Sequence, residues 1–346
     1  MFRPTRGPHS RAALAAVAMF TILTVLAGSA CGSGGARWDS RSVQETVANA
    51  PFQPILVNSN LGVGKNRLAL ALFDQNQEFV NVAEVTATFF HLDKEPKGEP
   101  TNPKQVSQAT MVAHTLKAVG VSRLDGVASR VPGRTSPSDV DAHIGHDSTV
   151  FVTNVDFDRA GFWGVSLDIK VGDSTFKGMR LVFAVQDRTL EPAVGEPAPA
   201  SKQLILADVK SVEEVDTSPT PNPDLHRMTI AQAVASGKPS VIAFVTPAFC
   251  QTRFCGPTLD QVVTPAWNEF KDRVNVLHVE PYDIPKAKGG TLETVPAVQE
   301  WKLLAEPAIF VVGRDGKVTA KFEGIMDYPE LQAAIQDALK APAAAK

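Results

Sequence analysis

The stretch VIAFVTPAFCQTRFCGP (residues 241–257) decides the fold of the C-terminal part of this chain. Residues 241–245 form an apolar run rich in β-branched side chains, which is typical of a strand buried on both faces. Cys250 and Cys255 follow in a loop, and Pro257 suits the first turn of a helix. Two thiols this close can form a small disulfide, and a thiol at a helix N-terminus has its thiolate stabilised by the helix dipole. The stretch therefore predicts a strand, a cysteine loop with redox chemistry, and a helix.

Beyond Met228 the pattern alternates between helices and short apolar strands. An Asp-Gly pair at residues 315 and 316 predicts a hairpin turn between the last two strands. Strands are predicted at residues 240–246, 274–279, 308–313 and 317–322, and helices at 229–236, 257–270, 295–304 and 328–340.

This order of elements resembles the thioredoxin fold, and short motifs add to the resemblance. FCGP (254–257) resembles the family's active-site signature, EPAIFVV (306–312) its cis-proline and buried strand, and DGKV (315–318) its final hairpin. The resemblance implies an α/β thioredoxin-like domain, which we place at residues 204–342. It further implies that Cys255 and Cys250 are catalytic, and that Glu306 and the cis-proline Pro307 bind an extended substrate.

The spacing of the cysteines departs from the family. The family's second cysteine stands three residues after the first, where this chain has Thr258, so that Cys250 is the available partner of Cys255. Two assignments are open: Cys255 attacks and Cys250 resolves, or the reverse. We favour attack by Cys255, because helix-dipole stabilisation acts within the first turn.

Residues 52–190 show short alternating strands separated by turn signals, which predicts an antiparallel β-sandwich. DRAGFWGV (158–165) resembles the entry to the penultimate strand of bacterial immunoglobulin-like (Ig-like) domains. A Pro/Ala-rich segment at residues 191–203 reads as a linker. Its few apolar residues predict that few contacts cross this boundary.

The first 30 residues have the pattern of a targeting segment, with basic residues, an apolar core and small residues before Cys31. LAGSAC (26–31) resembles the lipobox of bacterial lipoproteins, although Gly28 departs from it. The resemblance implies a signal peptide at residues 1–30, lipidation of Cys31, and a flexible tether at 31–51. It places the protein on the extracytoplasmic face of the cell membrane, where a disulfide persists.

Together these features predict a membrane-tethered, extracytoplasmic thiol–disulfide oxidoreductase. Its partners are protein thiols or disulfides, a redox partner that the sequence does not identify, and the membrane. The net charge of −3 argues against a nucleic-acid partner. We predict no cofactor and no metal, and the sequence does not decide whether His143 and His146 bind one.

Three alternatives use the same residues. A surface interaction or assembly lipoprotein would hold the cysteines in a structural disulfide. A peroxiredoxin-like peroxidase would use Thr252 three residues before Cys255, but Ala248 stands where that family has proline. A Sco-like copper chaperone would need a distant histidine, and His278, the only one after Cys255, lies within a predicted strand.

The lipidation hypothesis is tested by the substitution Cys31→Ser, because only the cysteine thiol can carry the lipid. We expect this variant to lose lipid labelling and to move from the membrane to the soluble fraction. Labelling that is unchanged in Cys31→Ser would contradict the hypothesis.

Overall fold

The computed structural model describes residues 38, 39, 43, 50–97, 101–118, 146–250, 252 and 254–341. The predicted signal peptide, Cys31, most of the tether and His143 lie outside these residues. Among the described helices, none combines the length and the apolar character that crossing a membrane requires.

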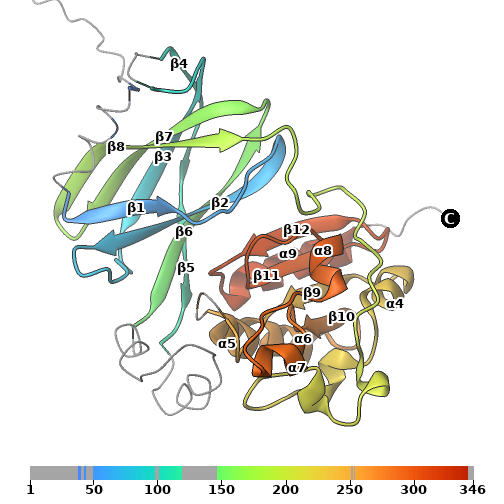
Figure 1. Cartoon of the computed structure of the whole chain (residues 1–346). Coiled ribbons are helices and arrows are strands. Elements are labelled where there is room, and N and C mark those ends of the chain that lie inside the picture. Colours follow the sequence, from blue (N-terminus) through green and yellow to red (C-terminus); the bar gives the residue numbers. More distant parts are fainter. Residues whose placement is uncertain are drawn as a thin grey trace, which may run out of the picture. The chain divides into compact units, whose positions relative to one another are not determined.

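Two four-stranded antiparallel sheets form the N-terminal part (Figure 1). Strands β1-β2-β6-β5 make one sheet and β4-β3-β7-β8 the other. Their inner faces share one core, in which Leu68 and Phe151 of the first sheet meet Phe89 and Trp163 of the second. This is a β-sandwich; its Ig-like identity stays a prediction. The strands are β1 (Phe52–Leu56), β2 (Gly64–Asp74), β3 (Glu84–Leu92), β4 (Pro103–Thr110), β5 (Val112–Leu116), β6 (Ser148–Phe157), β7 (Gly161–Val171) and β8 (Ser174–Val185).

Strand β4 shows where the sequence pattern was silent. Its residues are largely exposed and polar, so no apolar alternation marks it. It lies at the edge of its sheet and begins with Pro103, a position where the missing N–H removes no essential ladder bond. Pairing with β3, rather than local sequence preference, makes this segment a strand.

The C-terminal part contains one four-stranded sheet of order β10-β9-β11-β12. Strands β9 and β10 are parallel, whereas β11 runs antiparallel to both β9 and β12. The strands are β9 (Ser240–Phe244), β10 (Asn275–Val279), β11 (Ala308–Val312) and β12 (Val318–Glu323). The helices are α4 (Ile230–Ala235), α5 (Cys255–Thr258), η4 (Leu259–Val263), α6 (Thr264–Phe270), α7 (Ile284–Lys288), α8 (Pro296–Glu300) and α9 (Tyr328–Lys340).

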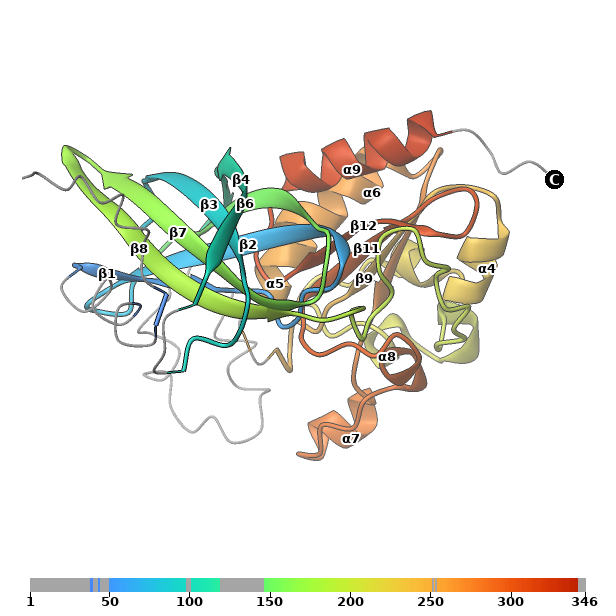
Figure 2. The ribbon, with the colours of Figure 1, turned by 90° about the horizontal axis from the view of Figure 1, so that it is seen from above.

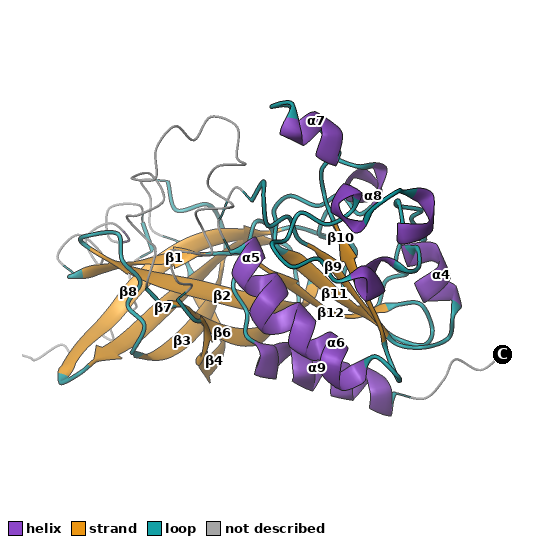
Figure 3. Cartoon of the chain, turned by 90° about the horizontal axis from the view of Figure 1, so that it is seen from below, coloured by secondary structure: helices purple, strands orange, loops and turns teal. Residues whose placement is uncertain are grey.

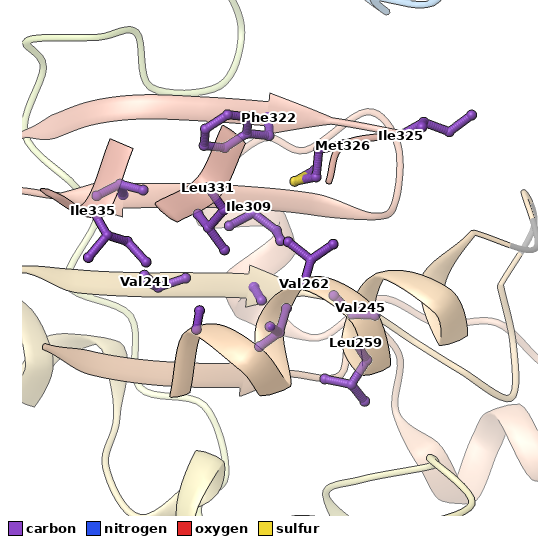
Figure 4. Packing of buried hydrophobic residues seen from close by; sticks show 14 of the residues in the cluster. Val241, Val245, Leu259, Val262, Ile309, Phe322, Ile325, Met326, Leu331 and Ile335 are labelled. Atoms are coloured by element: carbon purple, nitrogen blue, oxygen red, sulfur yellow. The ribbon is translucent and has the colours of Figure 1, made fainter. Parts of the chain in front are cut away.

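Helices cover both faces of this sheet, which explains why β9 is buried throughout and apolar from Val241 to Phe244. Helices α6 and α9 lie side by side over one face (Figures 2 and 3). There Val241 packs with Val262 and Ile335 (Figure 4). On the other face Phe244 packs with Trp301 beside α8.

The predicted helix at 257–270 begins two residues earlier and contains a π-helical turn. Segments α5, η4 and α6 follow one another without a break, and Thr264 N–H donates to the carbonyl of Leu259, five residues back. Pro265 comes next. Its ring clashes with a carbonyl four residues earlier in a regular α-helix, and it has no N–H to donate. The wider turn accommodates the proline inside the helix.

The segment 191–203 is attached to the C-terminal sheet. Gly195 N–H donates to Val318 O (2.8 Å), Val318 N–H to Glu196 O (2.9 Å), and Ala198 N–H to Gly316 O (2.9 Å). The segment therefore pairs with the β11–β12 hairpin, and the Pro/Ala composition did not reveal this pairing.

Side chains also join the sandwich to the C-terminal part, so the expectation of few contacts across this boundary is wrong. Arg67 of β2 makes a two-pronged ion pair with Glu330 of α9 (2.6 and 2.9 Å) and donates to the carbonyl of Ile325. His114 of β5 lies 2.9 Å from Asp327. The apolar cluster that contains Val262 and Ile335 also includes five residues of the sandwich, which are Ala69, Ala71, Leu116, Val150 and Val152.

Replacing Arg67 by methionine should destabilise the protein by about 3 kcal/mol, because Glu330 would keep a charge in a site that is nearly closed to water. Arg67 is 7% exposed in this pair. Arg159→Met is the matched control, since the Arg159–Asp158 pair is 52% exposed at both side chains, and such pairs contribute about 0–1 kcal/mol. Denaturant unfolding measures both variants, and equal losses would contradict a stabilising role for the Arg67–Glu330 contact.

Candidate functional site

The two cysteines lie where β9 ends and α5 begins. The loop between them and the strand is anchored by Ala248 and Phe249, which are buried together with Ala287. Cys250 is 5% exposed and Cys255 is fully buried, and both are free thiols. The buried strand and the helix therefore hold both thiols in place, with Cys250 nearer the surface.

The sulfur of Cys250 receives the helix N-terminal hydrogen bond. The backbone N–H of Cys255, the first residue of α5, donates to Cys250 Sγ at 3.3 Å. The first N–H groups of a helix have no partner within the helix, and they carry its partial positive charge. The hydroxyl of Thr252 lies 3.4 Å from the same sulfur. The single hydrogen of that hydroxyl is donated to the carbonyl of Glu306, so the N–H of Cys255 is the donor that stabilises negative charge on Cys250.

The pKa values of the two thiols diverge as a result. Burial opposes ionisation of Cys250, but hydrogen bonds from Cys255 and Thr252 outweigh it and lower the Cys250 pKa. Burial raises the pKa of Cys255 well above its ordinary value, and the neighbouring Cys250 sulfur raises it further. The prediction that Cys255 carries the stabilised thiolate is therefore wrong. The N–H at the start of the helix stabilises the sulfur of Cys250, whereas the Cys255 side chain is buried in the core.

Glu306 and Pro307 lie beside the thiols. The peptide bond between them is cis. Thr252, which contacts Cys250, donates its hydroxyl to the backbone carbonyl of Glu306 at 3.0 Å. Tyr282 donates its hydroxyl to Glu306 Oε1 at 3.2 Å, and burial together with the Glu306 charge raises the Tyr282 pKa. The fold therefore brings together the four residues that the sequence assigned to the site, and it adds Thr252 and Tyr282.

The sandwich contacts the same region. Phe79, in the turn between β2 and β3, meets the ring of Phe254 edge-on at 6.2 Å between ring centroids. Lys117 and Gln261 exchange two hydrogen bonds, in which the Lys117 N–H donates to the amide oxygen and the amide nitrogen donates to the Lys117 carbonyl. The loop and helix that carry the cysteines are thus held partly by the N-terminal part.

A second polar cluster lies inside the C-terminal part, and no sequence motif pointed to it. Asp216, His226 and His278 are all buried and have side-chain ligand atoms within 4.8 Å of one another. His278 lies buried on β10, within the strand that the sequence predicts, and its Nε2 is 2.8 Å from the carbonyl of Val245. His146 is exposed and belongs to no such cluster among the described residues.

Charge is stabilised strongly in this second cluster. Burial opposes ionisation of Asp216, but the hydrogen bond with His226 and the nearby imidazole of His278 hold its pKa well below the usual range. Burial likewise opposes a charge on His278, whereas Asp216 and Glu280 raise its pKa to about 9. The cluster therefore attracts positive charge into the interior.

Comparisons with known proteins found no matching family model and no matching curated protein. Among solved structures, the chain is similar to DsbF of MTB in mixed oxidised and reduced forms, with 20% identity, over 30% of this chain and 81% of that one, at a TM-score of 0.24. It is also similar to a thioredoxin-family thiol:disulfide interchange protein from Chlorobium tepidum TLS, with 16% identity, over 31% of this chain and 84% of that one, at a TM-score of 0.24. A third is the thioredoxin-like superfamily protein SPOA0173, with 16% identity, over 44% of this chain and 99% of that one, at a TM-score of 0.29.

The C-terminal part is thioredoxin-like because of its own strand order and directions, and because its cysteine loop lies between β9 and α5.

The difference between the thiols can be measured by alkylation. In Cys255→Ser, a serine hydroxyl can still donate to Cys250, and we expect the alkylation rate to rise with a midpoint below the pH of about 8.5 that is typical of a free cysteine. In Cys250→Ser, the buried Cys255 should react far more slowly at every pH. Faster alkylation of Cys250→Ser than of Cys255→Ser would contradict the assignment of the low pKa to Cys250.

Proposed function

We propose that this chain is a thiol–disulfide oxidoreductase in which Cys250 is the attacking cysteine and Cys255 the resolving one. The observation that carries the proposal is the hydrogen bond from the Cys255 N–H to Cys250 Sγ, together with the complete burial of Cys255. The thiolate is the nucleophile in exchange reactions, and it forms on the sulfur whose pKa is lowered. A buried thiol of high pKa, held close behind it, suits the second step.

Exchange with a substrate disulfide follows from this arrangement. The Cys250 thiolate attacks one substrate sulfur; a bond forms between these two sulfurs, the substrate S–S bond breaks, and the departing thiolate takes up a proton. The Cys255 thiol then loses its proton and attacks Cys250 Sγ, which breaks the mixed disulfide. The substrate leaves reduced by two electrons, and the two cysteines are left as a disulfide. The reverse sequence oxidises a substrate dithiol.

The substrate class is a protein thiol or disulfide in an extended segment. Glu306 has its backbone carbonyl beside Thr252, next to the reactive sulfur, and extended segments bind through backbone groups at such positions. Pro307 itself is buried, so Glu306 and Thr252 would make the direct contacts. The lipobox-like sequence at Cys31 supports tethering to the extracytoplasmic face of the membrane, where substrate disulfides exist.

Thr252 bears on the peroxidase alternative. That alternative relies on Thr252 standing three residues before Cys255, whereas the Thr252 hydroxyl lies 3.4 Å from the sulfur of Cys250. The copper-chaperone alternative needs a histidine that is free to join the cysteines, and His278 bonds to Val245 and faces Asp216. Both observations favour thiol–disulfide exchange.

Trapping of mixed disulfides tests the proposal. Cys255→Ser lacks the resolving thiol, so it should accumulate covalent complexes with extracytoplasmic proteins that dithiothreitol releases. Cys250→Ser is the matched control and should trap few, because its remaining thiol is buried.

Trapping by Cys250→Ser alone would reverse the two roles. If neither variant traps partners and the oxidised pair resists dithiothreitol, the disulfide is structural, and the chain is an interaction or assembly lipoprotein instead.

A further inference from the structure

The buried cluster of Asp216, His226 and His278 connects an irregular segment to the sheet. Asp216 lies in the loop after η2 (Val212–Glu214), His226 ends η3 (Pro223–His226), and His278 lies on β10. The preceding 3₁₀ turn, η1 (Leu206–Asp208), is equally short. Turns of three or four residues supply little stability of their own. Contacts with the sheet and its loops therefore hold this segment, among them the hydrogen bonds of Thr217 with Glu280 and Ala248.

The hydrogen bond of His278 fixes which ring nitrogen is available. Val245 O can only accept, so His278 Nε2, 2.8 Å away, carries the hydrogen. Nδ1 then faces Asp216 Oδ2 at 3.6 Å, too far for a hydrogen bond, and no described residue offers it another partner. A charged N–H would close on a carboxylate to about 2.7–2.9 Å. The spacing instead suits two ligand atoms with an ion between them.

The distances fit a small tetrahedral ion. Asp216 Oδ2 is 3.1 Å from His226 Nε2 and 3.6 Å from His278 Nδ1. Zn²⁺ bonds to imidazole nitrogen and carboxylate oxygen at about 2.0–2.1 Å, so neighbouring ligand atoms of a tetrahedral site stand about 3.4 Å apart. A backbone carbonyl bound to the other nitrogen of a ligating histidine is the usual outer contact of such sites.

The charges around the cluster also suit a cation. Within the described part of the chain, Asp216 has no lysine or arginine partner, and the neighbouring Glu280 adds a second buried acid, 3.9 Å from His278 Nε2. The other His/Asp/Glu group, formed by His114, Asp327 and Glu330, differs in this respect, because Arg67 already pairs with Glu330. A metal ion is thus better accommodated in the buried cluster than in the cluster at the sandwich.

We propose that Asp216 Oδ2, His226 Nε2 and His278 Nδ1 bind a divalent transition metal, with Zn²⁺ the best match to two imidazoles and one carboxylate. The site is closed to solvent, so its role is structural: it ties residues 216–226 to β10. Without metal, His278 is protonated at neutral pH, so binding releases one proton from His226 Nε2 and one from His278 Nδ1 as the metal takes their places. The proposal does not depend on the activity of the cysteines.

The test uses the full chain with Cys250→Ser and Cys255→Ser, so that the thiols cannot bind metal. The protein is unfolded with a chelator, freed of metal, and refolded with Zn²⁺ or Co²⁺, because a closed site takes up metal as it folds. We expect one bound ion per chain, a Zn²⁺-dependent rise in melting temperature, and the visible absorption of tetrahedral Co²⁺. His114→Gln, in the other cluster, is the control and should leave all three results unchanged.

Ligand variants make the test specific. Asp216→Asn and His226→Gln should each weaken Zn²⁺ binding by more than the roughly 10–100-fold that loss of an outer contact costs. His226→Cys keeps a ligand in place, so it should retain binding and add a thiolate-to-Co²⁺ absorption band. A folded protein that shows neither the Co²⁺ spectrum nor a Zn²⁺-dependent change in melting temperature would overturn the proposal and leave a protonated His278 between Asp216 and Glu280.

Discussion

Strand β9 is buried on both faces, and this constraint places the other elements of the C-terminal part. Val241 packs on the side of α6 and α9, while Phe244 packs on the side of α8. A strand with no face toward water favours apolar side chains, and from Val241 to Phe244 β9 has no others. The cysteine loop follows immediately at the carboxyl end of β9 and connects it to α5. The position of the thiols thus follows from the burial of the strand before them.

The chemistry of the two cysteines then depends on one hydrogen bond, from the Cys255 N–H to Cys250 Sγ, and on how deeply each thiol is buried. The Cys255 N–H belongs to the helix, but the sulfur that it contacts belongs to Cys250. Cys255 contributes its backbone to stabilise the partner's charge, while its own side chain is desolvated. Cys255 therefore lowers the pKa of Cys250, while burial raises the pKa of Cys255 itself. Two chemically identical thiols thus differ in how readily they ionise.

The sandwich and the C-terminal part share both apolar and charged contacts. Arg67 and Glu330 form a nearly buried ion pair next to the common apolar cluster, and Phe79 meets Phe254 beside the cysteine loop. A domain attached only through a flexible linker would leave the reactive loop free on all sides. Here the N-terminal part supports the loop and the helix that carry the thiols, which gives the sandwich a direct part in shaping the candidate site.

The sequence by itself determined the elements with strong periodicity and the place of the redox chemistry. Helix 328–340 was predicted at the bounds that the structure has, and the cysteine loop and the Glu306–Pro307 motif were identified from local patterns. Three features were not predicted: strand β4, the π-helical turn before Pro265, and the pairing of residues 195–198 with the β11–β12 hairpin. Each depends on a partner distant in the sequence or on a local clash.

Only the tertiary structure decided which thiol is ionised and which buried polar groups meet. A pKa depends on burial and on donors in three dimensions, and spacing along the chain contains neither. Asp216, His226 and His278 are separated by loops and a strand, so no local motif joins them. The order of apolar and polar side chains along the chain thus determined which segments could be buried. Only the packed fold determined which thiol ionises and which buried polar side chains lie together.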